Sequence, residues 1–80
     1  MNTYKLQYFS LLGDFTGKTH EELQSASSTP QELYTELQQL YSFDHDGSKF
    51  RVAINDEFGD WHDPLKDGDS IVFIPPVAGG

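Results

Sequence analysis

The run Ile71-Val72-Phe73-Ile74 restricts the possible folds of this chain more than any other segment, because four consecutive side chains are apolar. Successive side chains of a β-strand point to opposite faces of a sheet. A strand that is apolar on both faces is typical of the centre of a sheet, where at least one side is covered. Since the preceding Asp67-Gly68-Asp69 is a turn sequence, we expect a central strand over residues 70–74.

A second apolar strand is predicted at residues 4–11, where large aromatic residues alternate roughly with polar ones. Eighty residues are too few for two hydrophobic cores, and placing the two apolar strands side by side and parallel at the sheet centre buries both. A weak strand is expected at residues 19–26, and a further strand at residues 50–55. Turns are expected at residues 13–14 and 16–18, and a short return strand at Glu57-Phe58 after an Asn55-Asp56 turn.

A helix is predicted to begin after Thr29. Thr29 is a good N-cap, Pro30 suits the first helical position, and Glu32 completes the spacing of a capping box. Apolar residues then recur with the period of a helix. They predict one buried stripe on a helix of about 12 residues, formed by Leu33, Leu37 and Leu40 with Tyr34 and Tyr41 alongside.

These elements predict an α+β domain with one main helix on one face of a mixed sheet of about four to five strands. With the first and last strands parallel at the centre, this arrangement is the β-grasp. We expect the β-grasp domain to span residues 1–74, followed by an extended tail over residues 75–80.

The charge and the cysteine count limit the functions open to the chain. Its net charge of −8 opposes binding to nucleic acid and to anionic membranes. It favours a basic protein surface as partner, although solubility alone also explains it. The sequence has no cysteine, which excludes disulfides, thiolate metal sites and cysteine nucleophiles. No apolar run approaches membrane-spanning length and no signal peptide is visible, so we expect a cytoplasmic protein.

The last six residues, Pro75-Pro76-Val77-Ala78-Gly79-Gly80, have the composition of a projecting tail. The prolines restrict φ and favour an extended exit from the domain. The two glycines carry no Cβ, so this backbone can enter a channel that any side chain would block. A frayed end or a cloning remnant is the simpler explanation of Gly-Gly taken alone.

The segment from Val52 to Gly80 resembles the small subunits of molybdopterin synthase, within the wider family of ubiquitin-like sulfur carriers. The matching features are a strand ending in Asn55, the sequence His62-Asp63-Pro64-Leu65, the Asp67-Gly68-Asp69 turn, and the ending Phe73-Ile74-Pro75-Pro76-Val77-Ala78-Gly79-Gly80. Ile74 departs from the pattern, since an aromatic residue is common there. The N-terminal part matches more loosely. The resemblance favours a functional Gly-Gly over an accidental one.

The resemblance implies that the Gly80 carboxylate is the reactive group. A ubiquitin-activating-like adenylyltransferase would adenylate it with ATP, and persulfide sulfur would then displace AMP to leave a thiocarboxylate. Residues Pro75 to Gly80 would insert into the large subunit of molybdopterin synthase, in a heterotetramer, and donate sulfur to a pterin precursor for molybdenum cofactor biosynthesis. The chain would itself be no enzyme and would bind no cofactor, and its lack of a phosphate-binding glycine loop leaves ATP to the activating enzyme.

The resemblance also places Phe9, Phe58 and Ile74 together on the sheet face opposite the helix, as a partner-docking face. Strand alternation supports part of this, because Phe9 lies opposite Tyr8 and Ile74 opposite Phe73. The alternative is that these three side chains belong to the core.

Other functions and sites remain open or are disfavoured. The alternatives are a sulfur carrier for thiamine synthesis or tRNA thiolation, and a protein modifier like ubiquitin. No metal site is expected, because His20, His45 and His62 lack ligand spacing. The acidic turns at Asp44-His45-Asp46 and Asp67-Gly68-Asp69 are expected to be solvated loops.

Overall fold

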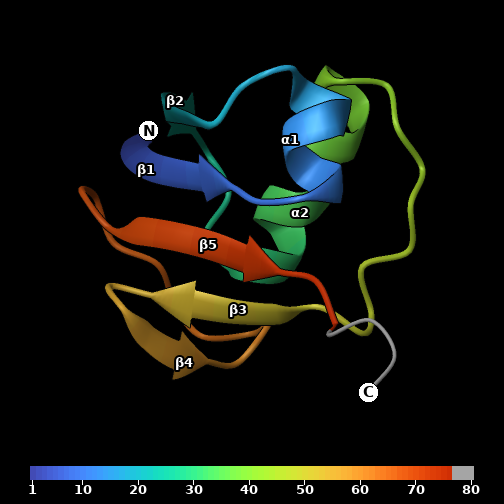
Figure 1. The fold of residues 1–80 in the computed structure, drawn as a ribbon. Helices are drawn as coiled ribbons and strands as arrows, with labels where there is room; N and C mark the ends of the chain where they lie inside the picture. The colour runs from blue at the N-terminus through green and yellow to red at the C-terminus, as the bar shows by residue number, and fades with distance from the viewer. Residues whose placement is uncertain (77–80) are drawn as a thin grey trace.

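The computed structural model describes residues 1–76, and its centre is the predicted strand β5 (Ser70–Ile74). The other strands are β1 (Asn2–Tyr8), β2 (His20–Ser25), β3 (Arg51–Ile54) and β4 (Glu57–Gly59). They form one sheet in the order β2-β1-β5-β3-β4. β1 and β5 are parallel, and the other neighbouring pairs are antiparallel. The parallel central pair and the β-grasp fold are therefore confirmed (Figure 1).

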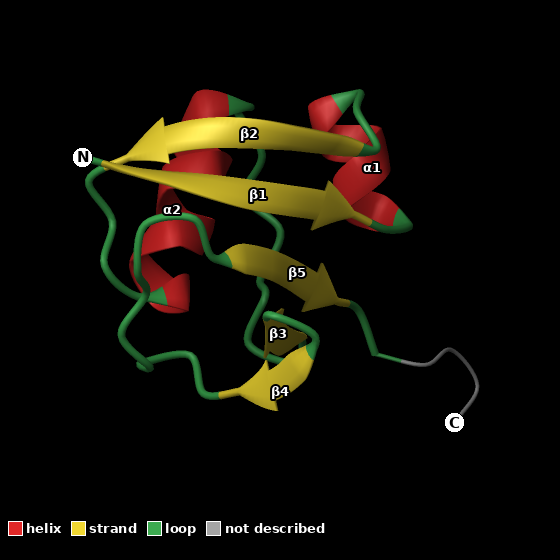
Figure 2. Ribbon diagram, turned by 90° about the vertical axis from the view of Figure 1, so that its left-hand side faces the viewer, coloured by secondary structure: helices red, strands yellow, loops and turns green. Residues whose placement is uncertain are grey.

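The predicted helix is α2 (Pro30–Leu40), which lies against one face of the sheet (Figure 2). The Thr29 hydroxyl accepts a hydrogen bond from the Glu32 N–H at 3.2 Å, as a capping box requires. The Glu32 carboxylate reaches back to Ser28, where it accepts bonds from the backbone N–H and the hydroxyl. These contacts fix the beginning of the helix at the predicted residue.

A short helix, α1 (Leu11–Thr16), occupies a region where the sequence predicted the end of a strand and a turn. β1 ends at Tyr8, so Phe9 follows the strand and is not part of it. Leu12 and Thr16 are one helical turn apart and both are buried, and the Thr16 hydroxyl donates to the Leu12 carbonyl at 2.8 Å. Gly17 then ends the helix with a positive φ of 72°. Burial of this single turn against the core outweighs its weak local propensity.

The predicted leucine stripe is partly wrong. Leu33 and Leu37 are fully buried, as is most of Tyr34, but Leu40 is 53% exposed. Leu40 lies on the last turn of α2, and Tyr41 caps that turn by donating its N–H to the Leu37 carbonyl. The buried face of the helix therefore ends one turn earlier than the sequence period predicts.

The core contains an aromatic cluster centred on Tyr34. Its ring makes edge contacts with four other aromatic rings at centroid distances of 5.3 to 6.0 Å, those of Phe43, Phe50, Trp61 and Phe73. The Tyr34 hydroxyl donates to the His45 carbonyl at 3.0 Å. The loop after α2 is thus tied to the core by packing and by a hydrogen bond.

We expect Gly47→Ala to destabilise the protein by about 1–3 kcal/mol, because a Cβ at Gly47 would lie 2.6 Å from Cζ of the Tyr34 ring. Gly13→Ala is the matched control, because its Cβ would come no closer than 3.6 Å to the atoms around it. In helix α1, that change should be neutral or stabilising by up to about 1 kcal/mol. Urea unfolding of both variants measures the difference, and equal stabilities would contradict the close approach of Gly47 to Tyr34.

Candidate docking face and the approach to the carboxyl terminus

The two faces of the sheet differ in what covers them. On β5, Ile71 and Phe73 point into the core under α2 and are almost fully buried. Val72 and Ile74 alternate with them, and both are half-buried on the uncovered face. β5 therefore carries apolar side chains onto the outer face, beside the point where the tail begins.

Phe58 reaches the same outer face through the β3–β4 hairpin. Asn55 and Asp56 form its two-residue turn, and both have positive φ (53° and 71°), the mark of a type I′ hairpin turn. This turn sets the register in which Phe58 lies opposite Ala53, which itself lies opposite Val72. Phe58 is 63% exposed, so the alternative that it belongs to the core is wrong.

Asn55 also holds the hairpin to the beginning of β5. Its backbone N–H donates to the Ser70 carbonyl at 2.8 Å, and its side-chain oxygen accepts from the Ser70 N–H at 3.0 Å. Its side-chain nitrogen donates to Asp69 at 3.0 Å. These three bonds fix the hairpin that presents Phe58 relative to the strand that leads to the tail.

Arg51 is a residue of this face that the sequence did not single out. It pairs with Ile74 in the β3–β5 register, and its guanidinium carbon lies 4.1 Å from the centroid of the Phe58 ring. A cation over an aromatic face is attracted by the ring quadrupole. The sequence pattern that could have identified Arg51 is the alternation of β3, which puts Arg51 and Ala53 on one face and Val52 on the other. Arg51, Phe58 and Ile74 therefore lie together on the outer face.

Phe9 lies at the far end of the same region. Tyr8 pairs with Phe73, so the next position along β1 is level with Ile74. Phe9 is 45% exposed, and its carbonyl accepts a hydrogen bond from the Leu12 N–H at 3.1 Å across a turn in which Ser10 has a φ of 52°. An exposed Phe9 agrees with the predicted docking role and argues against a core role. The role itself stays a prediction.

The part of the outer face formed by β1 and β2 is polar. There β1 contributes Lys5 and Gln7, and β2 contributes His20 and Glu22 in register with them. Within the strands, the apolar part of the face, which we call the docking patch, is therefore confined to Ala53, Phe58, Val72 and Ile74 with Arg51 at its side. It adjoins the end of β5. Phe9 directly follows the end of β1, outside this patch.

The chain leaves β5 through Pro75, which is half-buried, and Pro76, which is exposed. The predicted tail residues Val77, Ala78, Gly79 and Gly80 lie outside the described residues. The position of Pro76 places the beginning of the predicted tail at the docking patch and at the C-terminal end of the central strand.

A polar network ties the end of β1 to β2 and to the end of α2. The Glu21 carboxylate accepts hydrogen bonds from the Tyr8 and Tyr41 hydroxyls and pairs with Lys18 at 3.1 Å. Burial alone would raise the pKa of Glu21, but the bonds from Tyr41, Tyr8 and Lys18 outweigh it and hold that pKa below its usual 4.5. Burial, and then the bond to Glu21, raises the pKa of Tyr8. Glu21 is therefore ionised at neutral pH and links Tyr8 at the end of β1 to Tyr41 at the end of α2.

We expect the stabilisation from Glu21 to be present at neutral pH and to be lost in acid. Because its pKa is lower in the folded protein than in the unfolded chain, stability falls as the pH drops through the folded value. The stability difference between wild type and Glu21→Gln should therefore be largest at neutral pH and should shrink when the pH falls well below 4.5.

Glu22→Gln is the matched control for this experiment. Glu22 is the exposed neighbour of Glu21 on the outer face, and its side chain accepts no hydrogen bond from another side chain or backbone group within residues 1–76. Urea unfolding across this pH range measures the stability of both variants. Equal pH dependence of stability in Glu21→Gln and Glu22→Gln would contradict the stabilising role of ionised Glu21.

The described residues offer little for other kinds of site. Within residues 1–76, no group of three or more His, Asp or Glu side chains is placed to hold a metal ion. None of the helices there is long and apolar enough to cross a membrane. His20 lies on β2, whereas His45 and His62 lie in two separate loops. His45 is partly buried, near the rings of Phe15 and Phe50.

The fold is similar to several solved structures. Small archaeal modifier protein 1 of Haloferax volcanii matches with a TM-score of 0.79 and 18% identity, over 96% of this chain and 100% of that one. A chain of the complex of subunits 1 and 2 of molybdopterin-converting factor from Helicobacter pylori 26695 matches with a TM-score of 0.60 and 27% identity, over 98% and 99%. A chain of the BexX/CysO complex of Amycolatopsis orientalis matches with a TM-score of 0.67 and 22% identity, over 96% and 99%.

The sequence itself matches a family model. The ThiS family model covers residues 6–80, which includes the central strand, the docking patch and the Gly-Gly ending. The carriers of this family are small non-catalytic proteins. With nearly the whole chain covered, this protein belongs to the ThiS family of ubiquitin-like sulfur carriers.

Proposed function

We propose that this chain is the sulfur-carrying small subunit of molybdopterin synthase, with Gly80 as the residue that carries the sulfur. The observation that supports this most directly is the position of the docking patch. The patch adjoins the end of β5, from which Pro75-Pro76 lead into Val77-Ala78-Gly79-Gly80. A partner that covers Phe58 and Ile74 is thereby placed where it also receives the tail.

The chemistry begins with activation of the Gly80 carboxylate. An adenylyltransferase joins it to the α-phosphate of ATP and releases pyrophosphate, which gives the acyl carbon a good leaving group. The terminal sulfur of a persulfide attacks that carbon, and the carbon–oxygen bond to AMP breaks. A second thiol of the sulfur donor then attacks the donor's own sulfur atom in the acyl disulfide. The donor is released with a disulfide bond, and a thiocarboxylate remains at Gly80. Because this chain has no cysteine, no thiol of its own competes for the activated acyl group.

The tail has the reach that this role needs. Six residues from Pro75 to Gly80 extend to at most roughly 20 Å, enough to bring Gly80 into a site inside a partner. Fixing each residue in one conformation costs about 1–2 kcal/mol. The two prolines reduce this cost by restricting the free tail before it binds.

The acceptor of the sulfur follows from the partner that binds the chain. The Pro-Pro-Val-Ala-Gly-Gly ending with the Asp67-Gly68-Asp69 turn resembles molybdopterin synthase small subunits, and a similar chain occurs in the Helicobacter pylori complex of molybdopterin-converting factor subunits. We therefore propose the large subunit of molybdopterin synthase as the partner. Thiamine or tRNA thiolation would use the same activated Gly80 with another acceptor.

The test is the intact mass of the protein and the identity of what co-purifies with it from its native cell. Exchange of one oxygen for sulfur at Gly80 adds about 16 Da. We expect this gain together with a molybdopterin synthase large subunit. Co-purification with a thiazole synthase instead would move the proposal to the thiamine pathway.

A protein modifier is the second candidate, favoured by the similarity to small archaeal modifier protein 1. In that role, the activated Gly80 would be joined to lysine amines of target proteins. Isopeptide conjugates in cell extract, in which Gly80 is joined to a lysine of a target protein, would support it. Their absence together with the thiocarboxylate would leave the sulfur carrier as the function.

We expect Phe58→Ser to weaken binding to the large subunit by about 10- to 100-fold, because Phe58 is the most exposed large side chain of the docking patch and aromatic residues dominate interface energies. Leu40→Ser is the matched control, since Leu40 is also an exposed apolar residue but lies on α2, on the other side of the sheet. Calorimetric titration of each variant, with thermal unfolding to verify the fold, measures the effect. Equal affinities for both variants would place docking elsewhere.

A further inference from the structure

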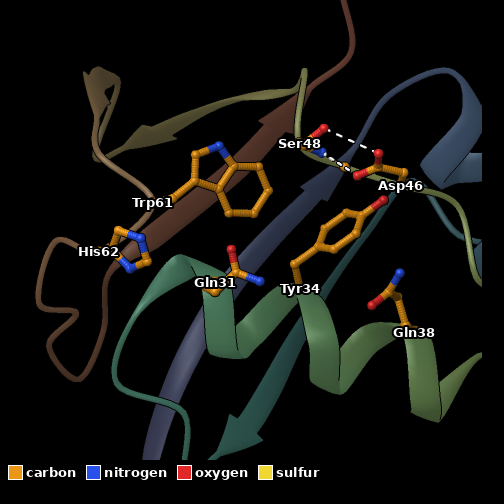
Figure 3. A pocket seen from close by; sticks show the side chains of 8 residues that line it. Gln31, Tyr34, Gln38, Asp46, Ser48, Trp61 and His62 are labelled. Carbon is orange, nitrogen blue, oxygen red and sulfur yellow. Dashed lines mark hydrogen bonds between the residues drawn. The ribbon is translucent and has the colours of Figure 1, made fainter.

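A cavity of about 340 Å³ lies on the helix side of the molecule, away from the docking patch. It is bounded by α2, by the loop around Asp46 and by the segment Trp61-His62 (Figure 3). Gln31 and Gln38 line it from the helix, with Tyr34 between them. None of the proposed steps at Gly80 uses this cavity.

The aromatic part of the cavity is held in place before any ligand arrives. The Tyr34 ring meets Trp61 edge-on at 5.6 Å, and Trp61 stacks on Phe73 at 5.3 Å. The Trp61 indole N–H donates to the Phe50 carbonyl, and the Trp61 carbonyl accepts from the Gln31 N–H, both at 3.0 Å. The wall formed by Trp61 is therefore fixed both to Phe50, which directly precedes β3, and to the beginning of α2.

The polar groups of the cavity are mostly acceptors. The Asp46 carboxylate accepts from the Ser48 N–H at 2.9 Å and from the Ser48 hydroxyl at 3.2 Å. These bonds hold the pKa of Asp46 below its usual value. Gln38 donates its side-chain N–H to the His45 carbonyl at 3.0 Å, which leaves its side-chain oxygen available. The Gln31 side chain has no hydrogen-bond partner within residues 1–76.

The cavity also lacks a positive charge of its own in the described part of the chain. Neither lysine nor arginine lines it, and Asp46 is in no salt bridge there. Lys49 is not among the lining residues, although its charge lies near enough to add to the effect of the Ser48 bonds in lowering the pKa of Asp46. An ionised carboxylate, amide oxygens and aromatic rings together form a surface that favours a cation.

We propose that this cavity binds an arginine side chain presented by a basic segment of a protein partner. A guanidinium is planar and weakly hydrated, so it packs against an aromatic ring such as that of Trp61, which is partly exposed. Its five N–H donors match the acceptors of Asp46, Gln31 and Gln38. The net charge of −8 draws a basic segment toward this surface.

The position of the cavity gives this contact a distinct role. Because the docking patch lies on the opposite face of the sheet, a partner held through the arginine leaves Phe58 and Ile74 uncovered. The protein can then be held on its helix side while the sheet side and the tail engage a second protein. This proposal does not depend on which chemistry occurs at Gly80.

The test is an NMR titration of the full chain at pH 8, where free imidazole is uncharged, with N-acetyl-arginine amide as probe. N-acetyl-citrulline amide, which has nearly the same shape without the charge, is the matched probe. We expect saturable shifts of the Trp61 indole N–H and of the Gly47 and Ser48 amides, with a dissociation constant on the order of 1 mM for a single side chain. The citrulline probe should bind at least about tenfold more weakly.

Asp46→Asn and Asp44→Asn are the matched variants, since each removes one charge from the same loop. Asn at position 46 still accepts from Ser48, and Asp44 is exposed and does not line the cavity. Asp46→Asn should weaken arginine binding by about fivefold or more, and Asp44→Asn by less than about twofold. Equal losses in both variants, equal binding of the two probes, or shifts spread over the acidic surface would each overturn the proposal.

Discussion

Deletion of Gly80 is expected to reduce formation of the thiocarboxylate by at least about 100-fold while the domain keeps its stability. The deletion moves the terminal carboxylate back by roughly 3.5 Å along an extended tail. A displacement of even 1 Å from the reactive geometry is enough for about a 100-fold loss of rate. The measurement is the rate at which the activating enzyme adds about 16 Da to the purified chain.

Two further tail variants sharpen this prediction. Ala78→Gly keeps the length of the tail and should be activated at close to the wild-type rate. Gly80→Ala also keeps the length but adds a Cβ beside the reacting carbon, and it should be slow because a narrow channel excludes that atom. Activation of the Gly80 deletion at the wild-type rate would show that the last carboxylate is not the group that reacts.

Leu37→Ala is expected to destabilise the domain by about 2–5 kcal/mol, because Leu37 is fully buried between α2 and the sheet and its truncation leaves a cavity. A domain of this size has only a modest stability in reserve. A large part of the population should therefore unfold at a urea concentration where the wild type stays folded. Urea unfolding followed by circular dichroism measures the free energy of unfolding.

Leu40→Ala is the matched control on the same helix. Leu40 is 53% exposed, so the same truncation should change stability by less than about 1 kcal/mol. If both leucines gave equal losses, Leu40 would have to be buried after all. If both the Gly80 deletion and Leu37→Ala unfolded the protein, the division between a folded body and a reactive tail would be wrong.

Much of the fold was readable from local patterns. The unbroken apolar run at residues 71–74 required a central strand, and the need to bury residues 4–8 as well placed β1 beside it. Thr29, Pro30 and Glu32 marked the beginning of α2 because capping depends on nearest neighbours in the chain. The Asn55-Asp56 turn predicted the hairpin that exposes Phe58, since few residues adopt positive φ at both turn positions.

Other features did not follow from local patterns. α1 has a single buried turn, and its Gly13-Asp14 pair is as typical of a turn as of a helix. The burial of Leu33 and Leu37 but not of Leu40 depends on where the sheet ends beneath the helix. The stacking of Arg51 on Phe58, and the cavity beside Trp61, bring together residues that are far apart in the sequence.

The sequence by itself determined the class of fold and the family, and it supplied the Gly-Gly ending on which the proposed function rests, because each depends on residue order over short spans. The tertiary structure alone decided that Leu40 is exposed, that Arg51 stacks on Phe58 and which acceptors surround the cavity. Strand register controls which side chains of the sheet are exposed, and the extent of the core beneath α2 controls which helix residues are buried. Both are set by how distant segments pack into one small core.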